Sequence, residues 1–234
     1  MTTSEILPGA EPFAADGGVN GVLVLHGLTS TPQSMRGLGE ALAAAGLTVE
    51  VPLLPGHGTT LDDLKATRWE DWCSAAELAF VELESRCDRV AVVGLSVGAM
   101  LGCWLAAHRP SLAALVVVNP FVEPPAEGFL DILRRTLEAG VETGPAVAND
   151  IAMPGSRELA YDGIPLASLL SVHEAQAELA PRLGDIGCPV LIMTSRQDHL
   201  VPTSSSDFLA ERAGGPVERV WLERSYHVAP LDYD

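Results

Sequence analysis

The stretch Val90-Ala-Val-Val-Gly94-Leu-Ser96-Val-Gly98-Ala-Met100 decides the fold of this chain. A run of Val and Ala typical of a buried strand leads into Gly-x-Ser-x-Gly, and a helix-like stretch over 97–108 follows at once. This order predicts a sharp strand-to-helix turn with Ser96 at its apex. Side chains at positions 94 and 98 would collide where strand and helix cross, which explains the two glycines. Because a chain with 22 glycines can contain the motif by chance, the flanking strand and helix carry the prediction.

The turn makes Ser96 a candidate nucleophile. It would lift the hydroxyl out of the sheet, beside the free backbone N–H groups at the start of a helix. A serine hydroxyl needs a base within hydrogen-bond reach, and that base needs an acid to fix its tautomer. In a parallel sheet these groups follow later strands, in the order serine, acid, histidine. Asp198 follows the strand-like stretch 191–194 and His227 follows the last one, so we predict a Ser96–Asp198–His227 triad.

Other candidates for the base and the acid fit less well. The remaining histidines lie in turns after strands, at a helix end, in the irregular middle of the chain or directly beside the acid: His26, His57, His108, His173 and His199. Glu223 is the main competitor of Asp198, because it is close to His227 in sequence. Asp185 and Asp207 fit surface positions.

An oxyanion intermediate requires two backbone N–H donors. We predict the N–H of Val97, which follows the nucleophile, and that of Leu28, in the turn after the first buried strand. The alternative for this second position is that His26-Gly27 forms a tight turn and nothing more.

The pattern of the whole chain predicts one α/β domain over residues 1–234. Apolar strand-like stretches alternate with helix-like ones, which is typical of a mostly parallel sheet covered by helices on both faces. The expected strands are 21–26, 47–54, 90–94, 115–119, 189–194 and 217–222. The expected helices between them are 32–45, 69–86, 97–108 and 206–213.

Residues 121–183 break this rhythm and predict an inserted cap. Two helix-like stretches, 127–138 and 166–180, flank a middle that is rich in Gly, Pro and Ala and has no strand pattern, 140–165. A departure of about sixty residues is too long for a simple loop. We therefore expect a small helical cap over the end of the sheet to which Ser96 points. The alternative is a helical excursion packed on the side of the sheet.

Composition and net charge indicate in which compartment the protein works and which classes of partner it would repel. With 47% hydrophobic residues, no membrane-spanning apolar run and no signal-peptide pattern, the chain is expected to be a globular cytoplasmic protein. Its net charge of −17, with Lys65 the single lysine among 14 basic residues, predicts repulsion of nucleic acids and anionic membranes. We expect no nucleic-acid partner and no stable membrane insertion, and the oligomeric state stays open. Cysteines without CxxC spacing indicate reduced structural thiols: Cys73, Cys87, Cys103 and Cys188.

Several blocks occur in an order typical of one protein family: His26-Gly-Leu-Thr-Ser-Thr-Pro-Gln-Ser-Met, Leu54-Pro-Gly-His-Gly-Thr, Trp69-Glu-Asp-Trp, Gly94-Leu-Ser-Val-Gly, Asp198-His-Leu-Val-Pro and Ser225-Tyr-His-Val-Ala-Pro-Leu-Asp-Tyr-Asp. From about residue 20 onward they resemble the bacterial carboxylesterase and monoacylglycerol lipase group of the α/β-hydrolase superfamily, least so between 124 and 178. The resemblance implies an α/β-hydrolase fold, the triad and oxyanion donors named above, and a small helical cap that lines an acyl pocket.

The chain departs from this group at the active site and at its end. Val97 and Ala99 stand where the group usually has Met or Leu and Gly, and Leu28 stands where it often has Phe. These changes keep the backbone donors but reshape the acyl site. Leu231-Asp-Tyr-Asp resembles the start of the C-terminal helix with which the group continues. Either the sequence is trimmed, or one sheet face is partly bare.

The sequence thus predicts a serine carboxylic-ester hydrolase that works through an acyl-enzyme and needs no metal or cofactor. Neutral short- to medium-chain esters or monoacylglycerols suit so acidic a protein better than anionic substrates. Apolar residues of the cap are expected to bind the acyl chain, although such residues more often form a cap's own core: Phe121, Val122, Phe129, Leu130, Leu133, Leu169 and Leu170. The alternatives are a thioesterase or C–C bond hydrolase with the same triad, or a small-ligand sensor with little turnover.

Overall fold

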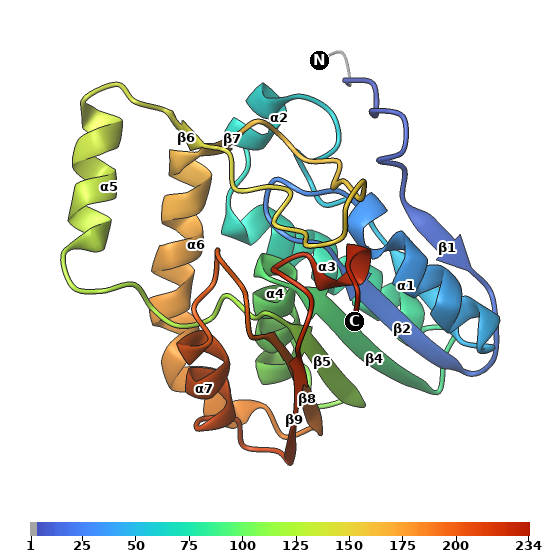
Figure 1. The fold of residues 1–234 in the computed structure, drawn as a ribbon. Coiled ribbons are helices and arrows are strands. Elements are labelled where there is room, and N and C mark those ends of the chain that lie inside the picture. Colours follow the sequence, from blue (N-terminus) through green and yellow to red (C-terminus); the bar gives the residue numbers. More distant parts are fainter. Residues whose placement is uncertain (1–3) are drawn as a thin grey trace.

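A seven-stranded sheet forms the centre of the molecule (Figure 1), and the computed structural model describes residues 4–234. The strands lie in the order β1-β3-β2-β4-β5-β8-β9, and neighbours are parallel except for β1, which pairs antiparallel with β3. Their bounds are β1 (Phe13–Ala15), β2 (Asn20–Leu25), β3 (Thr48–Val51), β4 (Arg89–Leu95), β5 (Ala114–Val118), β8 (Val190–Ser195) and β9 (Val217–Leu222). The predicted α/β fold is confirmed.

Helices cover both faces of this sheet (Figure 1). One face packs against α1 (Gln33–Ala44) and the 3-10 turn η2 (Ala229–Leu231). The other packs against α3 (Trp69–Glu84), α4 (Val97–His108) and α7 (Ser204–Ala210). Since successive side chains of a strand point to opposite faces, Val92 of β4 enters the core under α3 and α4, whereas Val93 enters the core under α1.

The strands and α-helices that the sequence pattern missed are all short. They are β1, α2 (Leu61–Lys65) and an antiparallel ribbon of β6 (Thr143–Pro145) with β7 (Gly163–Pro165). Residues 140–165 thus contain two strands although they have no strand pattern, because three-residue strands made partly of Gly and Pro show no alternation. The strand expected over 47–54 ends at Val51, since Pro52 has no N–H to donate to a ladder.

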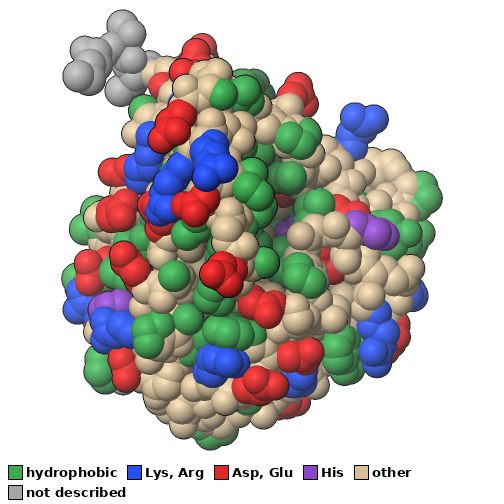
Figure 2. Space-filling view, turned by 90° about the vertical axis from the view of Figure 1, so that its left-hand side faces the viewer, with side chains coloured by type: hydrophobic (Ala, Val, Ile, Leu, Met, Phe, Trp, Pro, Cys, Tyr) green, Lys and Arg blue, Asp and Glu red, His purple; other side chains and the backbone are tan. Residues whose placement is uncertain are grey.

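The chain between β5 and β8, residues 119–189, is called the β5–β8 segment below. It contains α5 (Phe129–Glu138), the β6–β7 ribbon, α6 (Leu166–Leu179) and the 3-10 turn η1 (Ala180–Asp185). α6 packs beside α3 and contributes Val172 and Ala175 to the core, whereas α5 packs on α6 and leaves Ile132 62% exposed. Figure 2 views the molecule from the α5 side, where acidic and basic side chains intermingle with scattered hydrophobic ones.

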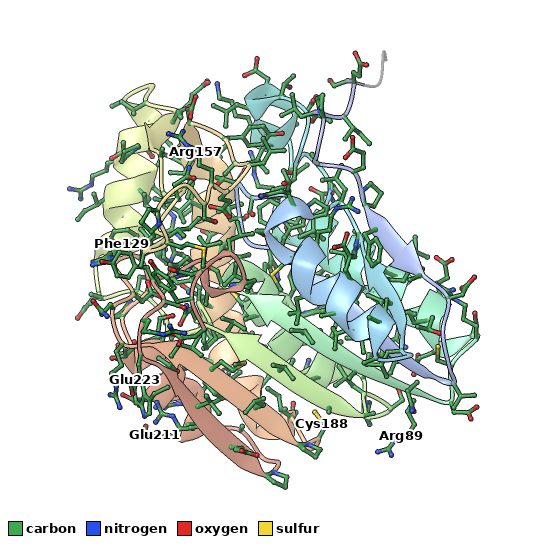
Figure 3. The ribbon with its side chains drawn as sticks, turned by 45° about the vertical axis from the view of Figure 1, so that its right-hand side comes forward. Arg89, Phe129, Arg157, Cys188, Glu211 and Glu223 are labelled. Atoms are coloured by element: carbon green, nitrogen blue, oxygen red, sulfur yellow. The ribbon has the colours of Figure 1, made fainter. Side chains whose placement is uncertain are left out.

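The irregular loop of this segment, residues 146–162, crosses above the carboxyl ends of the central strands (Figure 1). The N–H of Tyr161 donates to the carbonyl of Thr29 after β2 (3.1 Å), and the Ser156 hydroxyl donates to the carbonyl of Leu231 after β9 (2.7 Å). In Figure 3, Arg157 of this loop lies above the sheet, at the opposite end of the molecule from Cys188, which precedes β8.

All four cysteines are free thiols, and burial raises the pKa of Cys103 and Cys188. Among residues 4–234, no helix combines the length and the apolar character needed to cross a membrane.

Candidate active site

Ser96 lies in the sharp turn between β4 and α4, with φ 57° and ψ −116°. Residues with a Cβ rarely adopt this backbone conformation. A Cβ on Gly94 would collide with the carbonyl oxygen of Gly98, and a Cβ on Gly98 would collide with that of Leu25. Because these obstacles are backbone atoms of packed elements, they have little freedom to move aside. Steric need therefore accounts for both glycines of the motif.

Ser96 lies on the wall of a cavity of about 430 Å³. The turn after β2, the nucleophile turn and the β5–β8 segment all contribute to its wall. Most of the wall is apolar and includes Leu28, Phe121, Phe129, Val147, Ile164, Leu166 and Leu169. Polar side chains interrupt it at a few places: Ser30, Ser96, Glu158, His173 and His227.

The structure brings His227 and Asp198 into direct contact beside this cavity. His227 Nδ1 lies 2.7 Å from Asp198 Oδ2, and the two side chains are 7% and 2% exposed. The other carboxylate oxygen of Asp198 accepts the backbone N–H groups of Leu200 and Val201, each at 2.8 Å. Both carboxylate oxygens of Asp198 thus act as acceptors, so His227 Nδ1 is the donor in its contact with Asp198. His227 Nε2 is then left to accept a proton from the cavity side.

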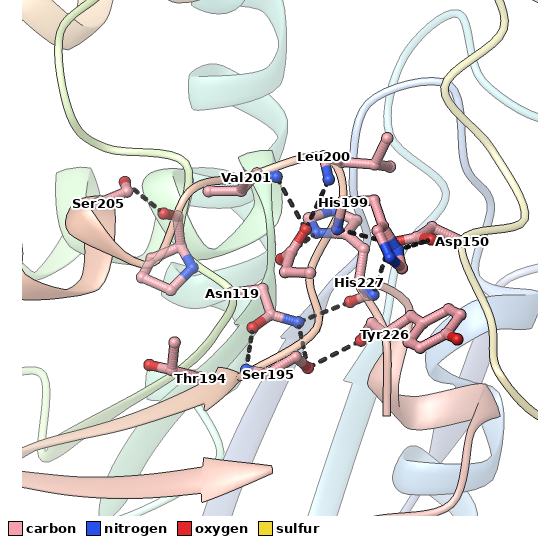
Figure 4. Close-up of polar contacts among 12 residues, drawn as sticks. Asn119, Asp150, Thr194, Ser195, His199, Leu200, Val201, Ser205, Tyr226 and His227 are labelled. Carbon is pink, nitrogen blue, oxygen red and sulfur yellow. Dashed lines mark hydrogen bonds and ion pairs between the residues drawn. The ribbon is translucent and has the colours of Figure 1, made fainter. Parts of the chain in front are cut away.

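A buried amide supports the His227 loop from below (Figure 4). Asn119, just after β5, donates from Nδ2 to the carbonyl of His227 (2.8 Å) and to the Ser195 hydroxyl (2.9 Å). Its Oδ1 accepts the N–H of Ser195 (2.7 Å), and the Ser195 hydroxyl donates to the carbonyl of Tyr226. The ends of β5 and β8 are thereby joined to the loop that carries His227. Sequence reasoning missed Asn119, which adopts a positive φ of 46°.

The two residues predicted as oxyanion donors, Leu28 and Val97, both lie in segments beside Ser96. Val97 is the first residue of α4, where N–H groups have no acceptor within the helix. Leu28 follows Gly27, and a Cβ on Gly27 would lie 3.5 Å from the Cβ of Ser96. The turn after β2 therefore runs directly beside the nucleophile, and both Leu28 and Val97 line the cavity.

His26 and His57 are buried in structural positions. His26 Nε2 accepts the N–H of Leu54 (3.2 Å), its Nδ1 lies 2.9 Å from the carbonyl of Gly27, and burial lowers the pKa of His26 to about 4. The ring of His57 packs edge-on against His26 and Trp72, and burial lowers the pKa of His57 well below its ordinary value. Both are therefore neutral at physiological pH.

His173 lies on the cavity wall, between the rings of Phe121 and Phe129. Its Nδ1 is 2.7 Å from Oε1 of Gln176, whose amide nitrogen donates to the carbonyl of Phe121 (3.0 Å). This arrangement requires a proton on Nδ1, and burial lowers the pKa of His173. His199 points instead to Asp150 (2.8 Å) and His108 to the carbonyl of Trp104 (2.7 Å).

The competing acids are engaged elsewhere in ion pairs on the surface. Those pairs are Glu223 with Arg196 (2.8 Å), Asp207 with Arg219 (2.7 Å) and Asp185 with Arg182 (3.1 Å). Figure 3 shows Glu223 at the outer edge of the sheet, near Glu211.

The residues expected to bind an acyl chain divide into two groups. Phe121, Phe129 and Leu169 lie on the cavity wall. Val122, Leu130, Leu133 and Leu170 lie outside that wall: Val122 is 1% exposed and belongs to the main core, and Leu133 and Leu170 pack in the small core between α5 and α6. Neighbours along a helix or loop point in different directions, so adjacent apolar residues do not share one wall.

Much of the wall comes from residues for which the sequence holds no periodic signal. Pro145, Val147, Glu158 and Ile164 belong to the irregular middle of the β5–β8 segment. Leu200 and Val201 follow the acid in the loop after β8.

Comparisons with known proteins agree with this geometry. The profile of the Hydrolase_4 family, described as serine aminopeptidase, S33, matches residues 19–234. A thermostable monoacylglycerol lipase of Bacillus sp. (strain H-257) is 40% identical over 237 residues, covering 98% of this chain and 91% of the lipase. A carboxylesterase of Bacillus subtilis (strain 168) is 25% identical over 228 residues, covering 95% and 90%. A solved structure described as "LipS and LipT, two metagenome-derived lipolytic enzymes" has a TM-score of 0.93 and 38% identity, covering 98% of this chain and 94% of that one.

Proposed function

The chain belongs to the Hydrolase_4 (serine aminopeptidase, S33) family of α/β-hydrolases, and from this premise we propose that it is a serine hydrolase of neutral carboxylic esters, monoacylglycerols among them. The observation that carries the proposal is the buried 2.7 Å contact between His227 and Asp198 beside a cavity that Ser96 also lines. A buried acid–histidine pair beside a serine on a strained turn is the arrangement that activates a hydroxyl nucleophile.

In the proposed reaction, Ser96 Oγ attacks the ester carbonyl while His227 Nε2 takes the hydroxyl proton. The N–H groups of Leu28 and Val97 stabilise the negative charge that develops on the carbonyl oxygen. The C–O bond to the alcohol then breaks, and His227 returns its proton to the leaving oxygen. Water, deprotonated by His227, attacks the acyl-enzyme in the same way and releases the carboxylic acid. Asp198 orients His227 and stabilises the imidazolium formed in each half of the cycle.

The side chains on the cavity wall favour a substrate ester that has one apolar end and one end with hydroxyl groups. Phe121, Ile164 and Leu169 offer an apolar surface for an acyl chain. Of the residues that the structure describes, Glu158 is the one carboxylate on this wall, and a carboxylate accepts hydrogen bonds from alcohol hydroxyls. The net charge of −17 disfavours anionic acyl donors such as acyl-CoA. This combination favours monoacylglycerols over thioesters of charged carriers.

We further propose that the chain acts as one hydrolase domain over 1–234 and that residues 121–183 serve as its cap. Loop 146–162 closes over the carboxyl end of the sheet, and α5 and α6 supply Phe129 and Leu169 to the acyl side of the cavity. A cap of this kind excludes water from the acyl chain and limits its length.

The test is hydrolysis of p-nitrophenyl esters from acetate to palmitate and of 1-monoacylglycerols, by wild-type protein and by Ser96→Ala. We expect wild-type turnover, with an optimum at short or medium chains, and a loss on the order of 10⁶-fold in kcat for Ser96→Ala with the fold retained. Turnover of thioesters in preference to oxygen esters would favour the thioesterase alternative. Folded wild-type protein that binds these esters without product would identify a sensor.

A further inference from the structure

Asp150 lies 48 residues before Asp198 and 77 before His227, yet its side chain contacts both of the loops that carry them (Figure 4). It belongs to loop 146–162 of the β5–β8 segment, and its side chain is 13% exposed. None of the sequence motifs points to it.

One carboxylate oxygen of Asp150 joins the two loops. Oδ2 accepts the backbone N–H of His199, the neighbour of the acid, and the backbone N–H of His227, the base, each at 3.1 Å. Oδ1 lies 2.8 Å from His199 Nδ1. Because both N–H groups converge on the same atom, Asp150 fixes the separation of the loop after β8 from the loop after β9.

The backbone of His227 is held from two sides. Its N–H donates to Asp150, and its carbonyl accepts from Asn119 (2.8 Å). The carbonyl of Asp150 also accepts the N–H of Val228 (3.1 Å). A base held at both backbone atoms keeps its ring in the orientation that the contact with Asp198 requires.

A second carboxylate fastens the same loop without touching either catalytic residue. Asp232 accepts the N–H groups of Ala152 (2.7 Å), Met153 (3.0 Å) and Tyr226 (2.9 Å). Asp150 and Asp232 therefore both join loop 146–162 to the His227 loop, but Asp150 alone of the two also reaches the acid loop.

We propose that Asp150 is a positioning residue for the Asp198–His227 pair, through which the seating of loop 146–162 controls the activation of Ser96. The proposal rests on the proposed function. Removal of the carboxylate frees the two loops to separate, and a displacement of about 1 Å in a catalytic group can cost on the order of 100-fold in rate. Substrate binding to the apolar wall does not depend on this contact.

The test compares Asp150→Ala, Asp150→Asn and Asp232→Ala with wild-type protein. The measurements are kcat and KM for p-nitrophenyl butyrate and the rate of Ser96 phosphonylation by a fluorophosphonate, which needs no knowledge of the natural ester. We expect Asp150→Ala to lose on the order of 100-fold in both kcat and phosphonylation rate, with little change in KM. Asp150→Asn, which keeps one oxygen acceptor but loses the other, should lose only several-fold in kcat, and Asp232→Ala should lose far less than Asp150→Ala.

Wild-type rates in folded Asp150→Ala, or equal losses in Asp150→Ala and Asp232→Ala, would overturn the proposal. If Asp150→Ala does not fold, the result for Asp150→Asn is decisive. A several-fold loss in kcat at constant KM supports the positioning role. A wild-type kcat means that Asp150 contributes to stability alone. Absence of hydrolysis and phosphonylation in the wild-type protein would instead overturn the proposed function.

Discussion

The β4–α4 turn and loop 146–162 both border the cavity of Ser96, but they are held in place in opposite ways. At the turn the backbone segments pack so closely that a Cβ on Gly94 would collide with the backbone of Gly98, and a Cβ on Gly98 with that of Leu25 in β2. The loop contains no helix or sheet strand and is held by hydrogen bonds to distant residues, among them Asp150 to His227 and Ser156 to Leu231. The Ser96 turn therefore depends on close packing between backbone segments, whereas the placement of Asp198 and His227 depends on side-chain hydrogen bonds between distant loops.

The largest effect is expected from Gly98→Ala, which disturbs the close backbone packing of the Ser96 turn. The new Cβ would collide with the backbone of Leu25, in the central strand β2, so strand and helix would have to separate. We expect a loss of more than about 4 kcal/mol in the free energy of unfolding. Guanidinium unfolding followed by circular dichroism measures it. Gly37→Ala in α1 is the control: nothing lies within 4 Å of its added Cβ, so stability should rise by about 0.5–1 kcal/mol. Equal stability of the two variants would contradict the steric account.

A smaller effect is expected on acidification, which acts through the buried His26 after β2. In unfolded chains the pKa of histidine is near 6.5, whereas burial lowers the pKa of His26 to about 4. Between these two pKa values His26 is protonated in the unfolded chain but neutral in the folded protein. The free energy of unfolding therefore falls as the pH falls. From pH 7.5 to pH 5 the loss from His26 is about 2 kcal/mol, and His57 adds to it in the same direction.

Guanidinium unfolding at pH 7.5 and pH 5 measures this loss. His26→Gln removes the titrating ring, so its difference between the two pH values should be smaller than that of wild type by about 2 kcal/mol. The exposed His108 provides the control, since His108→Gln should leave the wild-type difference in place. An unchanged difference in His26→Gln would show that other groups govern the acid response.

The same contrast explains what the sequence could predict. The sheet, the helices around it and the Ser96 turn follow from periodicity and from two glycines, and these expectations are confirmed by the fold. Asp198 and His227 could be predicted as a pair because strand ends mark the catalytic edge of a parallel sheet, and the structure places them in contact beside the cavity. Asp150, Asn119 and Glu158 could not be found in this way, because their roles come from contacts between segments that no local pattern encodes. Four of the seven expected acyl-binding residues lie off the wall for the same reason.

A third prediction concerns the loop's contribution to substrate choice. Glu158→Ala removes a charged acceptor from the cavity wall, so KM for a 1-monoacylglycerol should rise about tenfold. KM for a p-nitrophenyl ester of the same acyl length should stay constant, because that alcohol offers no hydroxyl. The control is Glu142→Ala, an exposed carboxylate of the same segment that pairs with Lys65. Equal increases for both substrates would mean that Glu158 shapes the pocket and does not recognise the alcohol.

The smallest expected effect is a gain in stability, and it measures backbone strain in the Ser96 turn separately from the loss of the hydroxyl. Ser96→Gly and Ser96→Ala both remove the nucleophile, but glycine alone relieves the cost of holding a Cβ at φ 57° and ψ −116°. After the entropy that glycine loses on folding, we expect Ser96→Gly to be more stable than Ser96→Ala by about 1 kcal/mol, or about 2–4 °C in Tm. Thermal unfolding of the two inactive variants measures the difference. If Ser96→Ala is as stable as Ser96→Gly, the β4–α4 turn stores no strain, and packing alone holds Ser96 in its backbone conformation.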